Sequence, residues 1–221
     1  LLNSLRFGPL DDPRNKYLMQ GVVEGISWYG NCIGVPDVGG EICFDDSYSQ
    51  NPLVNAMCVG LVRTESIATS AASEVDSVML LVGAGTGRDG IHGASGLASK
   101  TFEEEVELRP TVQVGNPFLE KVLIEACLEA LDTGLVHAIQ DLGAAGLTSA
   151  AVESAASGGR GIRLDISQVH LRELGMSPYE IMLSESQERM LLVVASENVP
   201  AIKAVMEKWD VTCREIGKVI E

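Results

Sequence analysis

An aspartate at the end of an apolar segment is the first candidate for chemistry. Asp141 follows the apolar run 136–139, and residues 143–146 are glycines and alanines whose backbone N–H groups are unobstructed where a helix is expected to begin. A carboxylate that can hold a cation would then meet helix amides that favour an anion. Such a turn can bind a phosphate group or the metal ion on one. The alternative, that Asp141 only caps the following helix, also fits because aspartate is a preferred cap.

Two further sets of polar side chains could contact a ligand. Glu185, Ser186 and Gln187 stand together just before an expected strand, where three hydrogen-bonding side chains could hold a polar sugar or an amide. Gln113 lies in an extended, otherwise apolar segment, where a glutamine needs hydrogen-bond partners. By themselves, the triplet is more simply a solvated loop, and Gln113 a residue that bonds to the backbone.

A glycine-rich loop at 83–95 follows an expected strand at 77–82. It lacks the Gly-Lys-Ser/Thr ending of a P-loop, and neither the helix nor the acidic partner of a dinucleotide site is evident. The loop could approach a phosphate or a domain interface, with Arg88 as the anion contact. The residue types alone favour a set of tight turns that need positive φ. The histidines show neither metal-ligand spacing nor a nucleophile partner: His92, His137 and His170.

The elements expected around these candidates alternate between strands and helices from residue 77 onward. Asn116 caps a helix that Pro117 opens and that runs to Asp132, with apolar residues at helical spacing. This order predicts an α+β fold, in which the end of an amino-terminal α/β domain is followed by an α/β sandwich domain with a mixed sheet. The other expected elements are strands at 136–139, 161–166, 189–195 and 211–220, and helices at 146–157 and 198–209.

The first part of the chain has a different character and predicts a separate domain. It combines glycine and asparagine in apolar surroundings with a polar loop at 44–52 and a strand-like run at 56–62. We expect one helix, connecting loops and a strand or two there. Residues 67–76 are small and polar and are the best candidate for a linker. The expected domains are residues 1–66, the C-terminal part of a first domain, and residues 67–221, a second domain.

Composition limits the function classes. The chain has 221 residues, of which 46% are hydrophobic, enough for one large domain or two small ones. Its formal net charge of -15 argues against nucleic acid or an anionic membrane as a partner. No apolar run approaches the roughly 20 residues of a membrane span, and no secretion signal is evident, so we expect a cytoplasmic protein. The five cysteines form no Cys-x-x-Cys pair and are expected to be reduced core residues.

Five motifs occur in the order and spacing of one enzyme family. Each is weak alone, but together they resemble the synthetase subunit of phosphoribosylformylglycinamidine synthase over essentially the whole chain. The resemblance implies a carbon–nitrogen ligase of purine biosynthesis. Formylglycinamide ribonucleotide, glutamine-derived ammonia and ATP would give formylglycinamidine ribonucleotide, ADP, phosphate and glutamate. The motifs are YGNCIGVP at 29–36, GTGRDGIHGA at 85–94, QVGNP at 113–117, DLGAAGL at 141–147 and ESQ at 185–187.

The resemblance also implies roles for the candidate residues. Gln113 and the triplet Glu185, Ser186 and Gln187 match substrate-contacting positions, and Asp141 matches a magnesium ligand. The implied partners are a glutaminase subunit and a small bridging subunit. The domains would be the end of a synthetase N-type domain and a synthetase C-type domain.

The sequence departs from the family in one respect. Nothing matches the family's Ser-His-Asn-His-like segment, which carries the catalytic histidine, so no catalytic residue is assigned. With no initiating methionine and an end just after an apolar run, the chain is expected to be an internal fragment. We expect it to be inactive alone, and ammonia-dependent ADP formation from the isolated chain with the ribonucleotide would contradict this.

Two alternatives stay open. Aminoimidazole ribonucleotide synthetase, thiamine-monophosphate kinase and selenophosphate synthetase resemble this two-domain plan, although the motifs at 29–36 and 185–187 point away from them. The other alternative is a noncatalytic nucleotide-binding or scaffolding module that contacts a glutaminase subunit.

Overall fold

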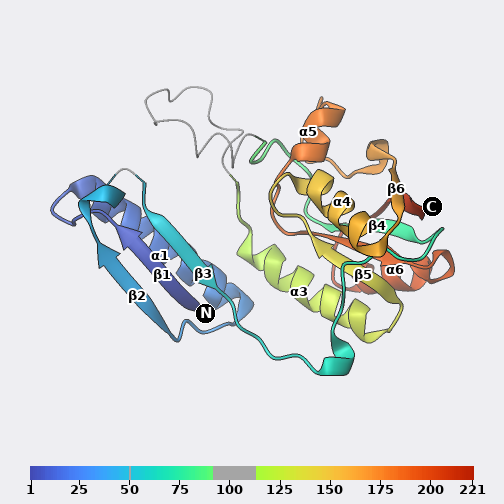
Figure 1. Ribbon diagram of the computed structural model, residues 1–221, viewed down its shortest axis with the longest axis horizontal. Helices are drawn as coiled ribbons and strands as arrows, with labels where there is room; N and C mark the ends of the chain where they lie inside the picture. The colour runs from blue at the N-terminus through green and yellow to red at the C-terminus, as the bar shows by residue number, and fades with distance from the viewer. Residues whose placement is uncertain (50, 92–112) are drawn as a thin grey trace. The chain divides into compact units, whose positions relative to one another are not determined.

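The computed structural model describes residues 1–49, 51–91 and 113–221. The chain divides into two compact units, residues 1–66 and 67–221, and Figure 1 shows the helices and strands of each. In the described part of the chain, no helix combines the length and the apolar character that crossing a membrane requires.

The first unit consists of one long helix and a three-stranded sheet. Helix α1 (Pro13–Ile33) begins at Asp12, whose side chain accepts a hydrogen bond from the backbone N–H of Arg14, and ends at Gly34 in the left-handed region. Strand β1 is parallel to β2 and antiparallel to β3, so this sheet is mixed. The strands are β1 (Leu2–Phe7), β2 (Gly39–Phe44) and β3 (Leu53–Met57), in the order β2-β1-β3, with short 3-10 turns at Asp46–Tyr48 and Thr64–Ser66.

Few side chains of the first unit are buried. Alternate residues of β1, including Leu5 and Phe7, are buried as the pleat of a strand requires, whereas all of β2 and β3 is exposed. Three of the five cysteines lie here and are exposed, so the expectation of a core position was wrong for Cys32, Cys43 and Cys58. The reason is that a single helix and a single sheet, in the described part of this unit, form no second layer over them.

The second unit is a five-stranded sheet with helices on both faces. Helices α3 (Pro117–Asp132) and α6 (Val199–Lys208) share one apolar cluster with one face of the sheet. Helices α4 (Gly146–Gly158) and α5 (Pro178–Leu183) share a second cluster with the other face. Two 3-10 turns lie at Ile166–Gln168 and Ser196–Asn198. The strands are β4 (Val78–Gly83), β5 (Val136–Asp141), β6 (Gly161–Leu164), β7 (Arg189–Val194) and β8 (Cys213–Ile220), in the order β5-β7-β4-β8-β6.

Strand β4 is the centre of this sheet. All six of its residues are buried, with Met79 and Leu81 in one cluster and Leu80 and Val82 in the other. A strand covered on both faces explains why its sequence is continuously apolar rather than alternating. Cys127 lies in the cluster on the α3 side, where burial raises the pKa of its thiol to about 12. This thiol is therefore a core residue, as expected.

The α+β fold class is confirmed, but the mixed sheet lies in the first unit rather than the second. All four strand pairs of the second sheet are antiparallel. A mixed sheet needs some parallel neighbours, and β7 and β8, joined by α6, do run in the same direction. They do not pair, because β4 lies between them. Strands β5 and β6, joined by α4, likewise lie at opposite edges of the sheet.

Candidate functional site

Glu185 lies at the centre of the candidate site, just after α5. Its Oε1 accepts a hydrogen bond from the backbone N–H of Ala145 at 3.0 Å, and its Oε2 accepts one from Nε2 of Gln113 at 2.9 Å. Its own backbone N–H donates to the carbonyl of Asp89 at 2.8 Å. The residue is only 7% exposed. One carboxylate thus joins the turn before α4 to the segment that leads into α3.

The turn between β5 and α4 contains two consecutive residues in the left-handed region. They are Ala145, with φ of 59°, and Gly146, with φ of 52°. No side chain caps α4, so the alternative in which Asp141 is its cap is not what the structure shows. Instead Asp141 is exposed, and its Oδ1 accepts a hydrogen bond from Nε2 of Gln140 at 3.3 Å. Ala145 is strained, because a non-glycine residue seldom adopts the left-handed conformation, and such strain is concentrated at functional sites.

Two amides of this turn already have partners. The N–H of Ala145 donates to Glu185, and the N–H of Gly146 donates to the carbonyl of Gly143 at 3.0 Å. A carboxylate therefore occupies the place that the N-terminus of α4 offers to an anion. The expectation that all the backbone amides of this turn stand unobstructed was wrong for these two residues.

The other two residues of the triplet differ in exposure. Ser186 is 1% exposed, and its Oγ accepts from the N–H of Gly87 at 2.9 Å and donates to the carboxylate of Asp89. Gln187 is partly exposed, and its Nε2 donates to the carbonyl of Glu185 at 2.9 Å. A solvated loop is therefore not the right description of the triplet, because two of its three side chains are buried and bonded.

Arg189, the first residue of β7, fixes this loop from within the unit. Its side chain is nearly buried, and burial lowers its pKa to about 10, so the guanidinium stays charged at neutral pH. Buried arginines are rare unless their N–H groups are bonded. Sequence reasoning missed this role, since the residue read only as the start of a strand. The guanidinium donates to the carbonyls of Ser184 at 2.6 Å and Ser186 at 2.8 Å and to Oγ1 of Thr86 at 2.9 Å.

The described part of the glycine loop contacts the protein itself. The guanidinium of Arg88, expected as an anion contact, forms ion pairs with Glu173 at 3.2 Å and Glu180 at 2.6 Å. The hydrogen bond from Arg88 holds the pKa of Glu180 at about 2. Glu173 and Glu180 therefore neutralise the positive charge of Arg88, which would otherwise attract a phosphate. The rest of the loop, including His92, lies outside the described residues, as does the acidic run at 103–107.

No ready-made metal centre is present in the described ranges. Among these residues, no group of three or more His, Cys, Asp or Glu side chains could hold a metal ion. His137 is half-buried, with Nδ1 3.4 Å from Oγ of Ser77 and 3.4 Å from a carboxylate oxygen of Glu74. Asp141 would have to bind a metal as one carboxylate, together with ligands from elsewhere. Magnesium is commonly held in this way, by one or two carboxylates, substrate phosphates and water.

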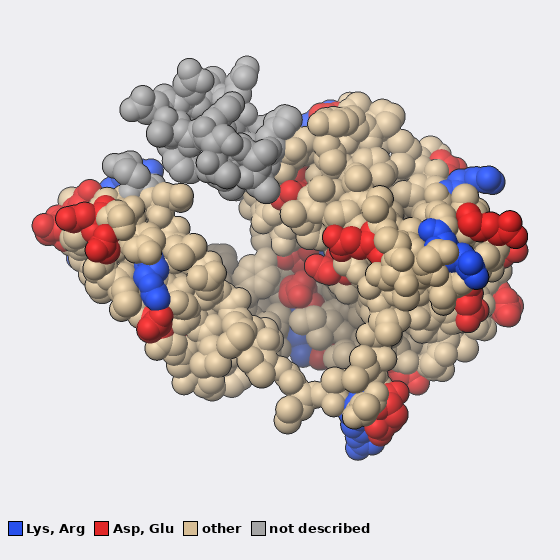
Figure 2. All heavy atoms as spheres, in the orientation of Figure 1, with Lys and Arg blue, Asp and Glu red and all other residues tan. Residues whose placement is uncertain are grey.

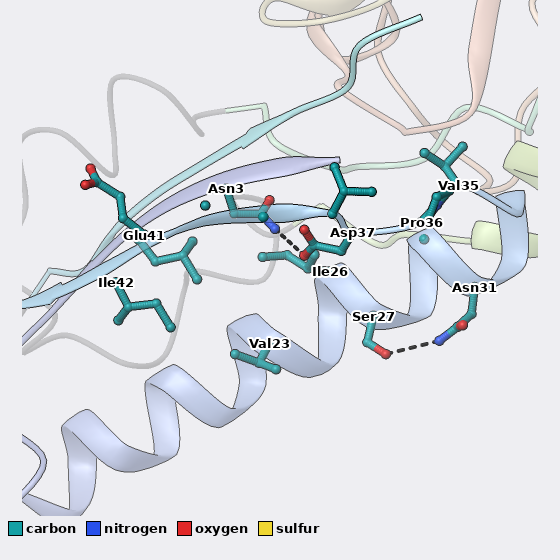
Figure 3. Close-up of a pocket in the computed structure, with 15 residues that line it drawn as sticks. Asn3, Val23, Ile26, Ser27, Asn31, Val35, Pro36, Asp37, Glu41 and Ile42 are labelled. Atoms are coloured by element: carbon teal, nitrogen blue, oxygen red, sulfur yellow. Dashed lines mark hydrogen bonds between the residues drawn. The ribbon is translucent and has the colours of Figure 1, made fainter.

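A cavity of about 750 Å³ lies in the first unit, between α1 and strands β1 and β2. Figure 3 shows apolar side chains of Val23 and Ile26 beside polar Asn3 and Asp37, which are hydrogen-bonded to each other. The motif at 29–36 contributes to its wall. Oδ1 of Asn3 is buried and has no partner within the described ranges. This cavity belongs to a different unit from the site around Glu185.

Charge on the surface argues for local binding of any phosphate. Figure 2 shows acidic side chains spread over the visible faces of both units, with fewer basic ones among them. The whole chain has 31 acidic and 16 basic residues. The field of the protein as a whole therefore repels anions, and a phosphate must be held by particular amides, a metal ion or a few basic side chains.

Comparisons with known proteins give consistent results for both units. Residues 1–62 match the model of the N-terminal domain of AIR synthase related proteins, and residues 74–221 match that of the C-terminal domain. The chain is 56% identical over 221 residues to phosphoribosylformylglycinamidine synthase subunit PurL of Thermomicrobium roseum. It is 55% identical to the same subunit of Thermoanaerobacter pseudethanolicus. Each match covers the whole of this chain, which spans 30% of the length of either relative.

Solved structures of Thermotoga maritima PurL have the same fold along the whole chain. For the structure complexed with FGAR, the TM-score is 0.90 at 41% identity, and the match covers all of this chain and 35% of the Thermotoga maritima chain. The structure complexed with ATP gives 0.82 at 38% identity and covers 33% of that chain. A structure named PurLQS, from the same organism, gives 0.84 at 39% identity and covers 33% of that chain. Escherichia coli HypE, 18% identical with a TM-score of 0.72, is similar in fold alone.

Proposed function

Since the chain belongs to the family of AIR synthase related proteins, whose two domain models match it, we propose that it is part of a phosphoribosylformylglycinamidine synthase. The complete enzyme would form formylglycinamidine ribonucleotide from formylglycinamide ribonucleotide, ammonia and ATP. Residues 1–66 would be the C-terminal part of the N-type domain and residues 67–221 the C-type domain, a division that the two compact units support.

One observation carries the proposal at the level of the site. Gln113 and the turn after Asp141 are joined through the carboxylate of Glu185, which lies 72 residues from Gln113 and 40 residues from Ala145 in the sequence. Two glutamine side chains, Gln113 and Gln187, then offer amide groups to a ribonucleotide, which needs hydrogen-bond partners for its amide and hydroxyl groups. These amides are the substrate contacts that we propose for this chain, with Ser186 and Glu185 in supporting positions.

Asp141 is the proposed magnesium ligand. Its carboxylate is exposed at the end of β5, and within the described ranges only its Oδ1 has a hydrogen-bond partner. Hard carboxylate oxygens suit magnesium, and the amide of Gln140 orients the group without consuming both oxygens. Magnesium, when bound, neutralises charge on the phosphates of ATP.

The substrates and partners follow from the relatives. The PurL complexes with FGAR and with ATP support both molecules as substrates of the whole enzyme. We further propose a glutaminase subunit and a small bridging subunit as partners, which the structure named PurLQS supports, and a cytoplasmic location. A noncatalytic scaffolding module is not favoured, because the similar solved structures hold substrate and nucleotide.

The experiment that tests the proposal changes Asp141 to asparagine in the full-length synthetase. We expect ammonia-dependent ADP formation with the ribonucleotide to fall about 10- to 100-fold at fixed magnesium, since an amide binds magnesium more weakly than a carboxylate. The magnesium concentration for half-maximal rate should rise. Asp132→Asn, at the exposed end of α3, is the control and should change neither quantity. An unchanged magnesium dependence in Asp141→Asn would contradict the assignment.

A further inference from the structure

We propose that Glu185 is a positioning residue: it turns the amide of Gln113 so that the carbonyl oxygen of Gln113 faces the ligand. Gln113 would then recognise an N–H or O–H group of the ribonucleotide, and Glu185 itself would not touch the substrate. This inference rests on the proposed function and adds that Gln113 accepts, rather than donates, the hydrogen bond to the ribonucleotide. It also assigns to Glu185 a role different from the substrate contact that the family resemblance implied.

Both carboxylate oxygens of Glu185 already accept hydrogen bonds from the protein. One oxygen accepts from the N–H of Ala145 and the other from the amide of Gln113. The backbone of Gly90 packs against it so closely that a Cβ added there would lie 2.6 Å from Oε2 of Glu185. The residue is only 7% exposed, so little of its carboxylate is accessible to a substrate group.

The orientation of Gln113 follows from the chemistry of its partner. A carboxylate can only accept hydrogen bonds, so the NH₂ of the glutamine amide must face Glu185. The carbonyl oxygen of the same planar amide then points away, and it has no partner within the described ranges. An amide on its own could present either end, and its hydrogen-bond network is what selects one. Gln113 therefore presents an acceptor.

Which end of the Gln113 amide faces the substrate depends on whether residue 185 is a carboxylate or an amide. A glutamine there could still accept from Ala145 through its carbonyl oxygen, but it would present an NH₂ to Gln113. Two NH₂ groups cannot bond to each other, so Gln113 would turn over and present its own NH₂ to the substrate. The substrate's donor group would then meet another donor. Leaving such a group unpaired should weaken the apparent affinity about 5- to 150-fold.

The test uses three variants of the full-length synthetase: Glu185→Gln, Gln113→Glu and the double variant that exchanges the two residues. In the double variant the glutamine now at position 185 donates to the carboxylate now at position 113, whose other oxygen again faces the ligand as an acceptor, and the net charge is unchanged. We expect Glu185→Gln to raise the KM for the ribonucleotide about 10-fold, with the KM for ATP unchanged. The double variant should return the ribonucleotide KM to within about threefold of the unmodified enzyme.

The control is Glu188→Gln, which alters a similarly buried carboxylate in the same loop, one that accepts from the backbone N–H of Asn116. Its KM values should not change. An unchanged ribonucleotide KM in Glu185→Gln, or a double variant that is no better than either single variant, would overturn the inference.

Hydrogen exchange separates this inference from the proposed function, because it needs no activity. In the full-length protein, Gln113→Glu sets two carboxylates against each other, which should displace Glu185 from the N–H of Ala145. Peptides covering 141–147 should therefore exchange faster in Gln113→Glu and regain protection in the double variant. If the unmodified enzyme formed no ADP with the ribonucleotide, the proposed function would fail, and the exchange pattern would still decide whether residues 113 and 185 are coupled. Equal exchange in all variants would refute the coupling.

Discussion

Replacing Gly146 by alanine is expected to destabilise the second unit by about 2–5 kcal/mol. The residue has φ of 52°, a conformation that costs an alanine about 1–2 kcal/mol. A Cβ there would also lie 1.8 Å from the carbonyl oxygen of Ser184 and 2.8 Å from its carbon. These are backbone atoms, so relief requires moving the loop itself, and forced overpacking of this kind costs about 1–3 kcal/mol more.

Gly159→Ala is the matched control for Gly146→Ala. Gly159 follows the other end of α4 with φ of 63°, but an added Cβ would have nothing within 4 Å. It should therefore show the backbone cost alone, about 1–2 kcal/mol. The difference between the two variants measures the contact with Ser184. Equal losses would mean that the loop yields freely and that Gly146 is needed only for its backbone conformation.

The measurement is urea unfolding followed by the fluorescence of Trp209. The chain has two tryptophans, and Trp28→Phe removes the exposed one in the first unit. Trp209 packs against the apolar cluster of α3 and α6 and donates a hydrogen bond to Glu129 at 2.8 Å. Its signal therefore reports the second unit, even if the two units unfold in separate steps.

Local signals in the sequence were sufficient for several elements of the fold. The Asn116-Pro117 pair located the start of α3, because a cap and a first-turn proline act on their own neighbours. The helix expected at 146–157 was also predicted correctly and is observed as α4, Gly146–Gly158. Strand β1 and helix α5 were not predicted, since the first is short and turn-flanked and the second has only six residues.

The order of the strands in the second sheet could not be predicted from local sequence patterns. The insertion of β4 between β7 and β8 is a pairing of strands more than 100 residues apart, and no periodicity encodes it. The run at 56–62 was expected to be a strand, but β3 ends at Met57, because the strand needs β1 as a partner and the pairing stops there. Patterns predict which segments are apolar and not which neighbour each one finds.

For the candidate site, too, the sequence predicted individual residues but not the contacts between them. The types and spacing of Gln113, Asp141 and the 185–187 triplet marked them as candidates, and their roles toward substrate and magnesium are still proposals. Their mutual contacts could not be predicted, because Glu185 meets Ala145 across 40 residues of sequence and Gln113 across 72. Only the fold shows that Glu185 and Ser186 are buried and bonded, whereas Gln113 is exposed and Gln187 is partly exposed.

Replacing Arg189 by methionine is expected to destabilise the second unit by about 3–5 kcal/mol. Methionine fills similar volume but donates no hydrogen bonds, so the buried carbonyls of Ser184 and Ser186 and the hydroxyl of Thr86 lose their partner. The cost of stranding buried polar groups exceeds the gain from adding apolar surface, since each unpaired group costs about 1–3 kcal/mol. Nearby Asp89 also loses a favourable charge, which acts on Arg189 in the folded unit.

Two comparison variants make the Arg189→Met measurement specific, again with Trp209 as the reporter. Arg163→Met alters an exposed arginine of β6 and should change the free energy of unfolding by no more than about 0.5 kcal/mol. Arg189→Lys keeps the charge without the planar fork of donors and should fall between the two. Equal losses in both methionine variants would show that the carbonyls find other partners. Because those carbonyls flank Glu185, Arg189→Met should also speed hydrogen exchange at 141–147, where the carboxylate holds Ala145.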